Sequence, residues 1–126
     1  MPIGKEIAAF TSTMTSMTKT TDAAGSHTYL INVEGTATGG LAGAVLGTIT
    51  ATTANLESGS FVADFTGYLA DGSVLAGLGS GAFGLKGIHN WQLNGTGTFS
   101  NGARFASEGV MELASRSYNG KVFEIT

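Results

Sequence analysis

Two histidines in the chain each precede an aromatic residue by two positions. His27 stands before Tyr29, and His89 stands before Trp91, the only tryptophan. Imidazole titrates near neutrality and can act as a general acid or base, and a phenol can donate a hydrogen bond to a developing oxyanion. These residues predict acid–base chemistry on a small molecule, with His89 and Tyr29 as the first catalytic candidates and His27 as the next.

A structural interpretation of the same residues stays open. Both histidines lie beside turn signals, where strand ends are commonly exposed to solvent. Trp91 is equally well explained as a core side chain, because large aromatic residues are usually buried. In a hollow protein Trp91 can belong to the core and contact a ligand as well.

Other catalytic and cofactor motifs are weak or missing. Residues 79–84 fit G-x-G-x-x-G, but the helix that a dinucleotide-binding fingerprint requires does not follow them. The chain has no cysteine, and its two isolated histidines have no carboxylate cluster beside them, so a metal site is not expected. There is also no G-x-S-x-G nucleophile elbow. We therefore predict neither a cofactor nor a metal.

Composition limits the class of protein and its partners. The 126 residues suffice for one domain, residues 1–126, with its own core. Only 12% are charged, 42% are hydrophobic and 20 are glycine. So many glycines would weaken helices, and the conspicuous threonines fit pleated sheets, so the composition favours an all-β fold. The net charge is −3 and the six cations are scattered, which argues against nucleic acid. With no signal-peptide pattern and no apolar run of about 20 residues, we expect a cytoplasmic protein without a membrane partner.

Turn signals recur at short intervals and divide the chain into strands. Gly, Asn-Gly and Asp-Gly tolerate the backbone of tight hairpin turns. The signals lie at residues 22–26, 39–40, 55–59, 71–72, 84–87, 101–102 and 119–120. They leave eight strand-like segments, approximately 5–19, 27–38, 41–54, 60–70, 73–83, 88–100, 103–115 and 118–126.

Short connections predict that successive strands are antiparallel neighbours. Eight such strands form an up-and-down meander, and closure into a β-barrel removes its exposed edges. The predicted fold is therefore all-β, an eight-stranded antiparallel up-and-down β-barrel with an apolar interior cavity. A two-sheet sandwich is the alternative.

Alternation within the strands separates an apolar face from a polar one. From His89 to Phe99 the odd positions carry Trp91, Leu93 and two glycines, whereas the even positions carry Asn, Gln and Thr. A period of two assigns these sets to opposite faces of a sheet. We assign the aromatic and glycine face to the interior, where glycine leaves volume unfilled and an eight-stranded barrel has room for one small ligand.

This assignment predicts one ligand site at one mouth of the barrel. The second, fourth, sixth and eighth strands all begin at the same end, which brings His27 and His89 face to face above Tyr29 and Trp91. A pocket of this kind is the usual location of a ligand site. The residues expected to contact a small hydrophobic ligand are Trp91, Phe61, Phe65, Phe99, Phe105, Met111 and Tyr118.

Two further points depend on which face points outward. The inverted assignment, polar inside and apolar outside, describes a small outer-membrane barrel, but the connections are short at both ends and no signal peptide is evident. A β-bulge could also exchange the faces locally and turn Asp64 and Tyr68 inward. Scattered apolar residues on the outward face predict a homo-oligomer interface; they are Leu30, Leu46, Val62, Leu78 and Val110.

Residues 93–102 (LNGTGTFSNG) and 59–67 (GSFVADFTG) carry a family resemblance. In these stretches and in its overall rhythm the chain resembles the allene oxide cyclase-like barrels, a group that includes dirigent proteins and small bacterial cyclases. The resemblance implies an eight-stranded barrel with an apolar cavity, often a dimer or trimer. It also implies cofactor-free cyclisation or isomerisation of a hydrophobic molecule. No residue here matches the catalytic acid of that group.

Three functions follow as hypotheses. The first is a cofactor-independent cyclase, isomerase or lyase that acts on a small hydrophobic or aromatic metabolite, since a dry cavity orients its substrate and excludes water. The second is a non-catalytic carrier or sensor for a hydrophobic ligand. The third is a structural module whose core has no cavity.

Overall fold

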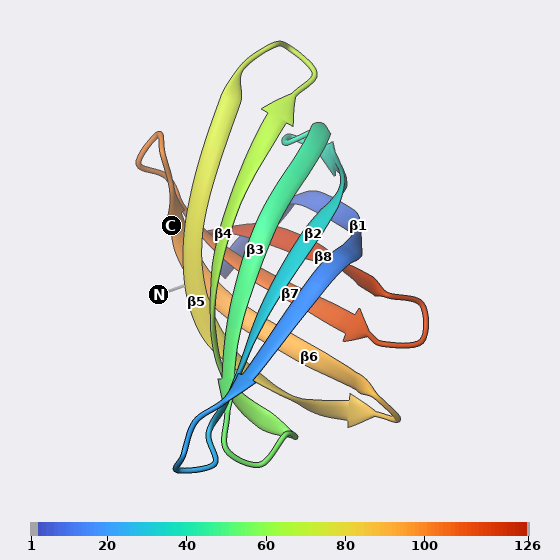
Figure 1. Ribbon diagram of the computed structural model, residues 1–126. Coiled ribbons are helices and arrows are strands. Elements are labelled where there is room, and N and C mark those ends of the chain that lie inside the picture. Colours follow the sequence, from blue (N-terminus) through green and yellow to red (C-terminus); the bar gives the residue numbers. More distant parts are fainter. Residues whose placement is uncertain (1–2, 126) are drawn as a thin grey trace.

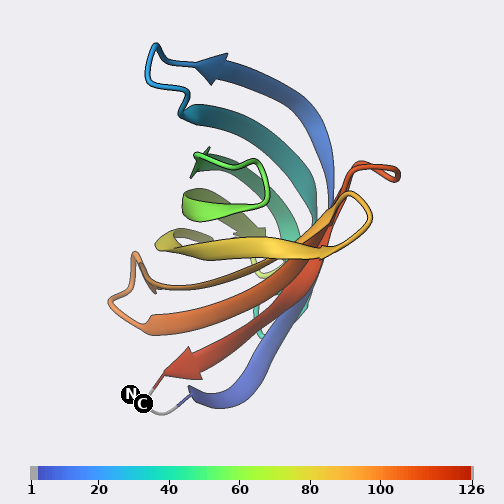
Figure 2. The same cartoon turned by 90° about the horizontal axis from the view of Figure 1, so that it is seen from below.

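The computed structural model describes residues 3–125 as a closed antiparallel barrel of eight strands joined in sequence order (Figure 1). The strand β1 pairs with both β2 and β8, which closes the ring (Figure 2). The predicted all-β, up-and-down barrel is thereby confirmed, and the sandwich is wrong. The strands are β1 (Ile3–Thr21), β2 (His27–Gly39), β3 (Gly43–Thr53), β4 (Ser58–Leu69), β5 (Val74–Gly87), β6 (Asn90–Phe99), β7 (Arg104–Glu112) and β8 (Ser117–Ile125).

The alternation of each strand places its apolar side chains inside the barrel. Ile31 and Val33 of β2 are buried, whereas Leu30 and Glu34 of the same strand are exposed. The same period of two runs through the other strands because successive side chains of a strand point to opposite faces. Within residues 3–125, most of the buried hydrophobic residues belong to two clusters, one around Ile31, Leu93 and Met111 and the other around Phe99 and Phe105.

The turn between β5 and β6 lies at residues 88–89, directly after the glycine-containing residues 84–87 that predicted it. Strand β5 continues through residues 84–87, with a register shift between Leu85 and Gly87. The turn is formed instead by Ile88 and His89, and His89 adopts a left-handed φ of 53°. Glycine favours a turn because it readily adopts a positive φ. Neither Gly84 nor Gly87 has a positive φ, so these two glycines do not form the turn.

Asn119 and Gly120 are likewise part of a strand. The β7–β8 turn occupies residues 113–116, where Arg116 has a φ of 55°. Gly120 is paired with Gly109 of β7, and a Cβ at Gly120 would be 2.6 Å from the Gly109 Cα. This glycine therefore permits two strands to approach closely. From the local sequence alone, a glycine with this role looks the same as a glycine that forms a turn.

The register of β4 decides the orientation of Asp64 and Tyr68. Residues 59–69 pair with β3 without interruption, and residues 58–68 pair with β5 in the same way. The irregularities lie in β1 and β5 instead, at positions such as Met14/Ser16. Asp64 and Tyr68 consequently keep the outward phase and are exposed, so the inward turn considered for them does not occur.

Aromatic rings lie over several of the inward-facing glycines. The Phe65 ring is 2.6 Å from where a Cβ of Gly77 would be, and the Phe105 ring is 2.6 Å from the corresponding point at Gly97. Each phenylalanine is also the register partner of that glycine on the neighbouring strand. Because Gly77 and Gly97 have no side chain, the phenylalanine rings occupy the space above them. This corrects the expectation that the glycines leave their volume unfilled.

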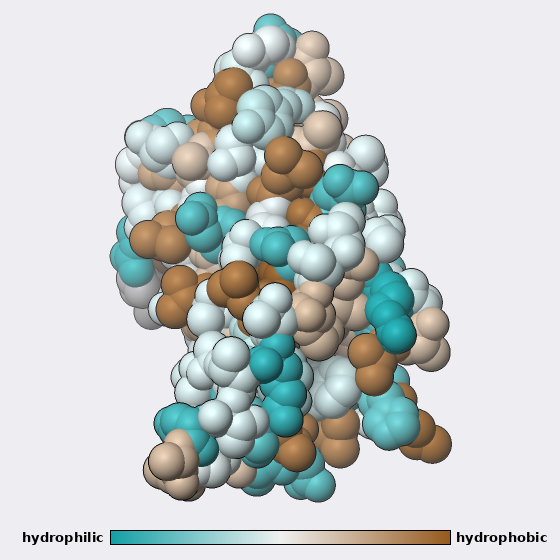
Figure 3. Space-filling view, in the orientation of Figure 1, coloured by the Kyte–Doolittle hydropathy of each residue, from teal (hydrophilic) through white to brown (hydrophobic). Residues whose placement is uncertain are grey.

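The outer surface alternates apolar and polar residues on the wall formed by β2–β5 (Figure 3). Leu30, Leu46, Val62 and Leu78 are all exposed there, as the alternation predicts. A homo-oligomer that uses this surface stays a prediction. Among residues 3–125, no helix has the length and apolar character needed to cross a membrane.

Candidate functional site

Residues 3–125 line a cavity toward each end of the barrel interior. One end carries the turns β1–β2, β3–β4, β5–β6 and β7–β8, and the other carries the turns β2–β3, β4–β5 and β6–β7. The Trp91 cavity, near the first end, has a volume of about 170 Å³, and the Tyr118 cavity, near the second, has about 100 Å³. Ile49 lines both cavities. The single pocket expected from the sequence is therefore divided in two.

The Trp91 cavity is lined almost wholly by apolar side chains. Trp91 and Tyr29 supply its polar atoms, together with Thr53, whose hydroxyl donates to the Ser58 carbonyl at 2.6 Å. Three methionines contribute flexible thioethers that adapt to ligands of different shape. The remaining lining residues are Met14, Met17, Ile31, Ile49, Ala51, Leu56, Phe83, Leu93, Met111 and Leu113.

Leu56 lies at the mouth of this cavity in an unusual backbone conformation. Its φ is 67°, the residue is 46% exposed, and it still contributes to the lining. The Thr53 hydroxyl accepts a hydrogen bond from the Leu56 N–H at 3.0 Å, and the Asn55 carboxamide oxygen accepts from the next two N–H groups. Side-chain hydrogen bonds thus hold a bulky residue in a left-handed conformation at the entrance. Met17, 42% exposed, lines the same mouth.

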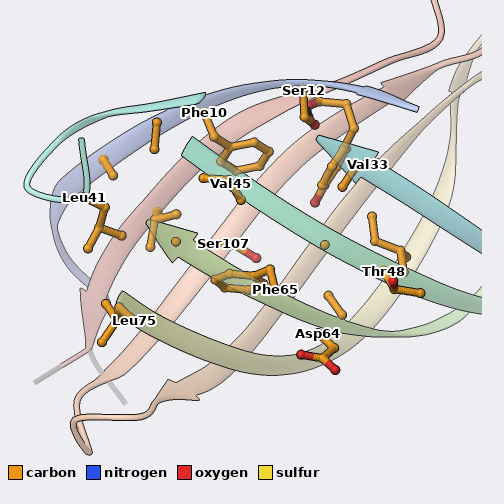
Figure 4. Close-up of a pocket in the computed structure, with 18 of the residues that line it drawn as sticks. Phe10, Ser12, Val33, Leu41, Val45, Thr48, Asp64, Phe65, Leu75 and Ser107 are labelled. Carbon is orange, nitrogen blue, oxygen red and sulfur yellow. Dashed lines mark hydrogen bonds between the residues drawn. The ribbon is translucent and has the colours of Figure 1, made fainter. Parts of the chain in front are cut away.

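The Tyr118 cavity lies among Phe10, Val45, Phe65 and Leu75 (Figure 4). Thr48 and Asp64 border it, but they belong to the outward phase of their strands. Figure 4 shows the Asp64 carboxylate directed away from the centre of the cavity. The polar side chains that face inward are therefore those of Ser12, Ser107 and Tyr118.

Tyr118 is the most deeply buried titratable group in the described part of the chain. Its ring packs against Phe10, with centroids 5.2 Å apart, and lies over Gly109 of β7. Burial raises the pKa of the Tyr118 phenol well above its ordinary value, so the group is neutral and can donate a hydrogen bond. The Ser12 hydroxyl donates to the Tyr118 carbonyl at 2.5 Å and is thereby engaged in the structure.

Neither histidine lines a cavity. His27 begins β2 as expected, but it is only half-buried and its Nδ1 lies 2.8 Å from the Thr21 hydroxyl. His89 was expected to open a strand in the inward phase. This is wrong, because β5 extends to Gly87 and places His89 in the turn, where it is exposed. Both histidines lie at the Trp91 end of the barrel, yet no imidazole belongs to the lining of either cavity.

The structure divides the other predicted site residues between the two cavities. Tyr29, Trp91 and Met111 line the Trp91 cavity. The residues that line the Tyr118 cavity are Phe61, Phe65, Phe99 and Tyr118. Phe105 lines neither, since it is 1% exposed and packs within the aromatic cluster, 4.5 Å from Phe99 and 5.5 Å from Phe65 between ring centroids.

Two inward hydroxyls had not been singled out from the sequence. Ser12 lies between Phe10 and Met14 in the inward phase of β1, and Ser107 lies between Phe105 and Gly109 in that of β7. The same alternation that identified the aromatic face contains both serines. A hydroxyl on an otherwise apolar face was the signal that could have found them.

Residues 3–125 contain no cluster of three or more His, Cys, Asp or Glu side chains that could hold a metal ion. No family model, curated protein or solved structure matches this chain. The resemblance to allene oxide cyclase-like barrels therefore stays an expectation. Any function has to be argued from the two cavities themselves.

Proposed function

We propose that the protein binds a small hydrophobic or aromatic molecule in the Trp91 cavity. The observation that carries this proposal is an apolar cavity of about 170 Å³ whose lining residues Met17 and Leu56 are also exposed at the surface. Apolar cavities of about 150 Å³ in other proteins stay dry and take up benzene. The volume suits a single ring with a short substituent, and the exposed lining provides an entrance.

The expected affinity follows from the apolar surface that such a ligand would bury. Each buried CH₂ group contributes about 0.8 kcal/mol, so a molecule of seven carbons such as toluene gains roughly 5–6 kcal/mol. This corresponds to a Kd on the order of 0.1 mM. A natural ligand that also uses the indole N–H of Trp91 or the Tyr29 hydroxyl would bind more tightly.

Titration with toluene, followed by the emission of Trp91, tests the proposal. Trp91 is the only tryptophan and lines the cavity, so a ligand in contact with it changes its emission. The variant Ala51→Leu fills the Trp91 cavity and should abolish the response. The matched variant Ala63→Leu fills the Tyr118 cavity and should leave the response intact.

Thermal unfolding of each variant checks that it is folded, since overpacking typically costs 1–3 kcal/mol. A folded wild-type protein that gives no saturable response to toluene would refute the proposal. Equal loss of binding in both variants would also contradict it, because the ligand would then not be confined to the Trp91 cavity. Native mass spectrometry of the purified protein would identify a molecule that is already bound.

A cofactor-independent cyclase, isomerase or lyase is the second candidate. One observation favours it: a neutral phenol, Tyr118, faces a largely apolar cavity, where a hydrogen-bond donor can stabilise a developing oxyanion. It has less support than binding because neither His27 nor His89 reaches a cavity. Incubating the identified ligand with the protein separates the two functions, since a carrier returns the molecule with unchanged mass and retention time.

A further inference from the structure

The Tyr118 cavity contains two hydroxyl groups that the fold does not use. Within residues 3–125, the Tyr118 Oη and the Ser107 Oγ make no hydrogen bond, whereas the third hydroxyl, that of Ser12, donates to a backbone carbonyl. Tyr118 is 9% exposed, and Ser107 is half-buried. Two hydroxyls without a protein partner, in a cavity that is otherwise apolar, are free to hydrogen-bond to a ligand.

Both hydroxyls reach the open space of the cavity. In this part of the chain, every side-chain oxygen or nitrogen that is completely enclosed has a hydrogen-bond partner. The Tyr118 Oη and the Ser107 Oγ are therefore not sealed within packed atoms. They remain able to interact with a molecule in the cavity.

The two hydroxyls lie on the same stretch of the wall. The Tyr118 ring crosses from β8 over Gly109, and its Oη is 3.0 Å from where a Cβ of Gly109 would be. Ser107 is the next inward residue of β7, about 6.6 Å along the strand. Phe10 and Phe65 line the same cavity and provide apolar surface for the remainder of a ligand.

The charges around the cavity favour a neutral ligand. Asp64 is the charged residue among the described residues that line it, and its side chain belongs to the outward phase of β4 and points away from the cavity. The inward phase of β8 continues from Tyr118 through Val122 to Glu124, so an anion entering along this strand would meet an acidic residue. A carboxylate would lose its hydration without gaining a cation, which is strongly unfavourable.

We propose that Tyr118 and Ser107 bind the oxygen of a small neutral carbonyl compound, a ketone, aldehyde or lactone, whose hydrocarbon part fills the Tyr118 cavity. Two donors match a carbonyl oxygen, which has two lone pairs and no proton of its own. The volume of about 100 Å³, below the ~150 Å³ of a cavity that holds benzene, limits the ligand to a single small ring of about six non-hydrogen atoms. This inference rests on the proposed function only in requiring that small hydrophobic molecules enter the barrel.

Cyclopentanone and methylenecyclopentane are suitable probes, since they have similar shapes and differ in the carbonyl oxygen. Binding is followed by ¹⁵N NMR titration of the full chain, which measures millimolar affinities and locates the site. We expect Tyr118→Phe and Ser107→Ala each to weaken cyclopentanone binding roughly 2- to 12-fold, the effect of one net hydrogen bond. Methylenecyclopentane binding should stay within about 2-fold, and Tyr29→Phe, which removes the same atom from the other cavity, should affect neither probe.

The outcomes separate this inference from the proposed function. If both probes bind but Tyr118→Phe and Ser107→Ala leave the affinity for cyclopentanone unchanged, the carbonyl site is refuted and hydrophobic binding stands. If Ala63→Leu, which fills the Tyr118 cavity, does not reduce cyclopentanone binding, the proposed location is wrong. Binding of cyclopentanecarboxylate as tight as that of the ketone would overturn the preference for a neutral ligand. If neither these probes nor toluene binds, both proposals fail.

Discussion

Replacing Tyr118 with phenylalanine should stabilise the protein. The ring keeps its packing on Phe10 and over Gly109, whereas the hydroxyl that is removed makes no hydrogen bond within residues 3–125 and borders the cavity. A buried polar group without a hydrogen bond costs about 1–3 kcal/mol. Because this hydroxyl borders a cavity and is not fully enclosed, we take the lower end of this range of free energies. The free energy of unfolding of Tyr118→Phe should therefore exceed that of the wild type by about 1 kcal/mol at pH 8.

The difference should grow at alkaline pH. Burial raises the pKa of Tyr118 in the folded state, while the unfolded chain has the ordinary value of 10.0. Below pH 10 both states keep the proton, so stability does not depend on this group. Above pH 10 the unfolded state ionises first, and stability is lost by about 1.4 kcal/mol per pH unit until the folded phenol titrates. At pH 11 the wild type should have lost about 1.4 kcal/mol that Tyr118→Phe retains.

Urea unfolding followed by Trp91 emission, at pH 8 and pH 11, measures both effects, with Tyr29→Phe as the comparison for removing a phenol from the other cavity. A Tyr118→Phe variant less stable than the wild type at pH 8 would show that the hydroxyl has a structural partner. Parallel pH dependence of the wild type and Tyr118→Phe would show that the phenol ionises freely in the folded state. The first result would remove the basis for a carbonyl-binding hydroxyl.

Three further predictions concern the glycines, the aromatic cluster and the cavity mouth. Gly97→Ala places a Cβ against the Leu78 carbonyl and 2.6 Å from the Phe105 ring, so urea unfolding should show a loss of about 2 kcal/mol or more in the free energy of unfolding. A Cβ at Gly84 would meet nothing within 4 Å, so Gly84→Ala should change stability by less than about 0.5 kcal/mol. Equal effects of the two substitutions would contradict the close packing at Gly97. Phe105→Ala should cost roughly 3–5 kcal/mol in the same assay, because the ring is fully buried, and a loss below about 1 kcal/mol would contradict its place in the core. Leu56→Gly removes a left-handed φ that costs a non-glycine residue about 1–2 kcal/mol, so the variant should be at least as stable as the wild type. The substitution also opens the mouth of the Trp91 cavity, so toluene should bind faster in stopped-flow fluorescence. An unchanged association rate would show that Leu56 does not limit entry.

Local sequence patterns determined the strands and the face to which each side chain belongs. The period of two from His89 to Phe99 correctly predicted that Trp91, Leu93 and Phe99 share a face, because alternation follows from the geometry of a single strand. Glycine signals were less specific. Residues 84–87 and 119–120 lie in strands, since glycine also permits close strand approach and leaves space for a neighbouring ring.

Only the tertiary structure decided how deep each side chain lies and which residues it meets across the barrel. The sequence placed Tyr118 at the same mouth as His27, but its ring extends over Gly109 and its hydroxyl enters the cavity at the other end. Depth and reach depend on strand tilt, register and side-chain rotamers, which combine residues far apart in the chain. For the same reason the single expected pocket became two cavities, and Ser107, at an inward position of β7, lines the same cavity as Tyr118.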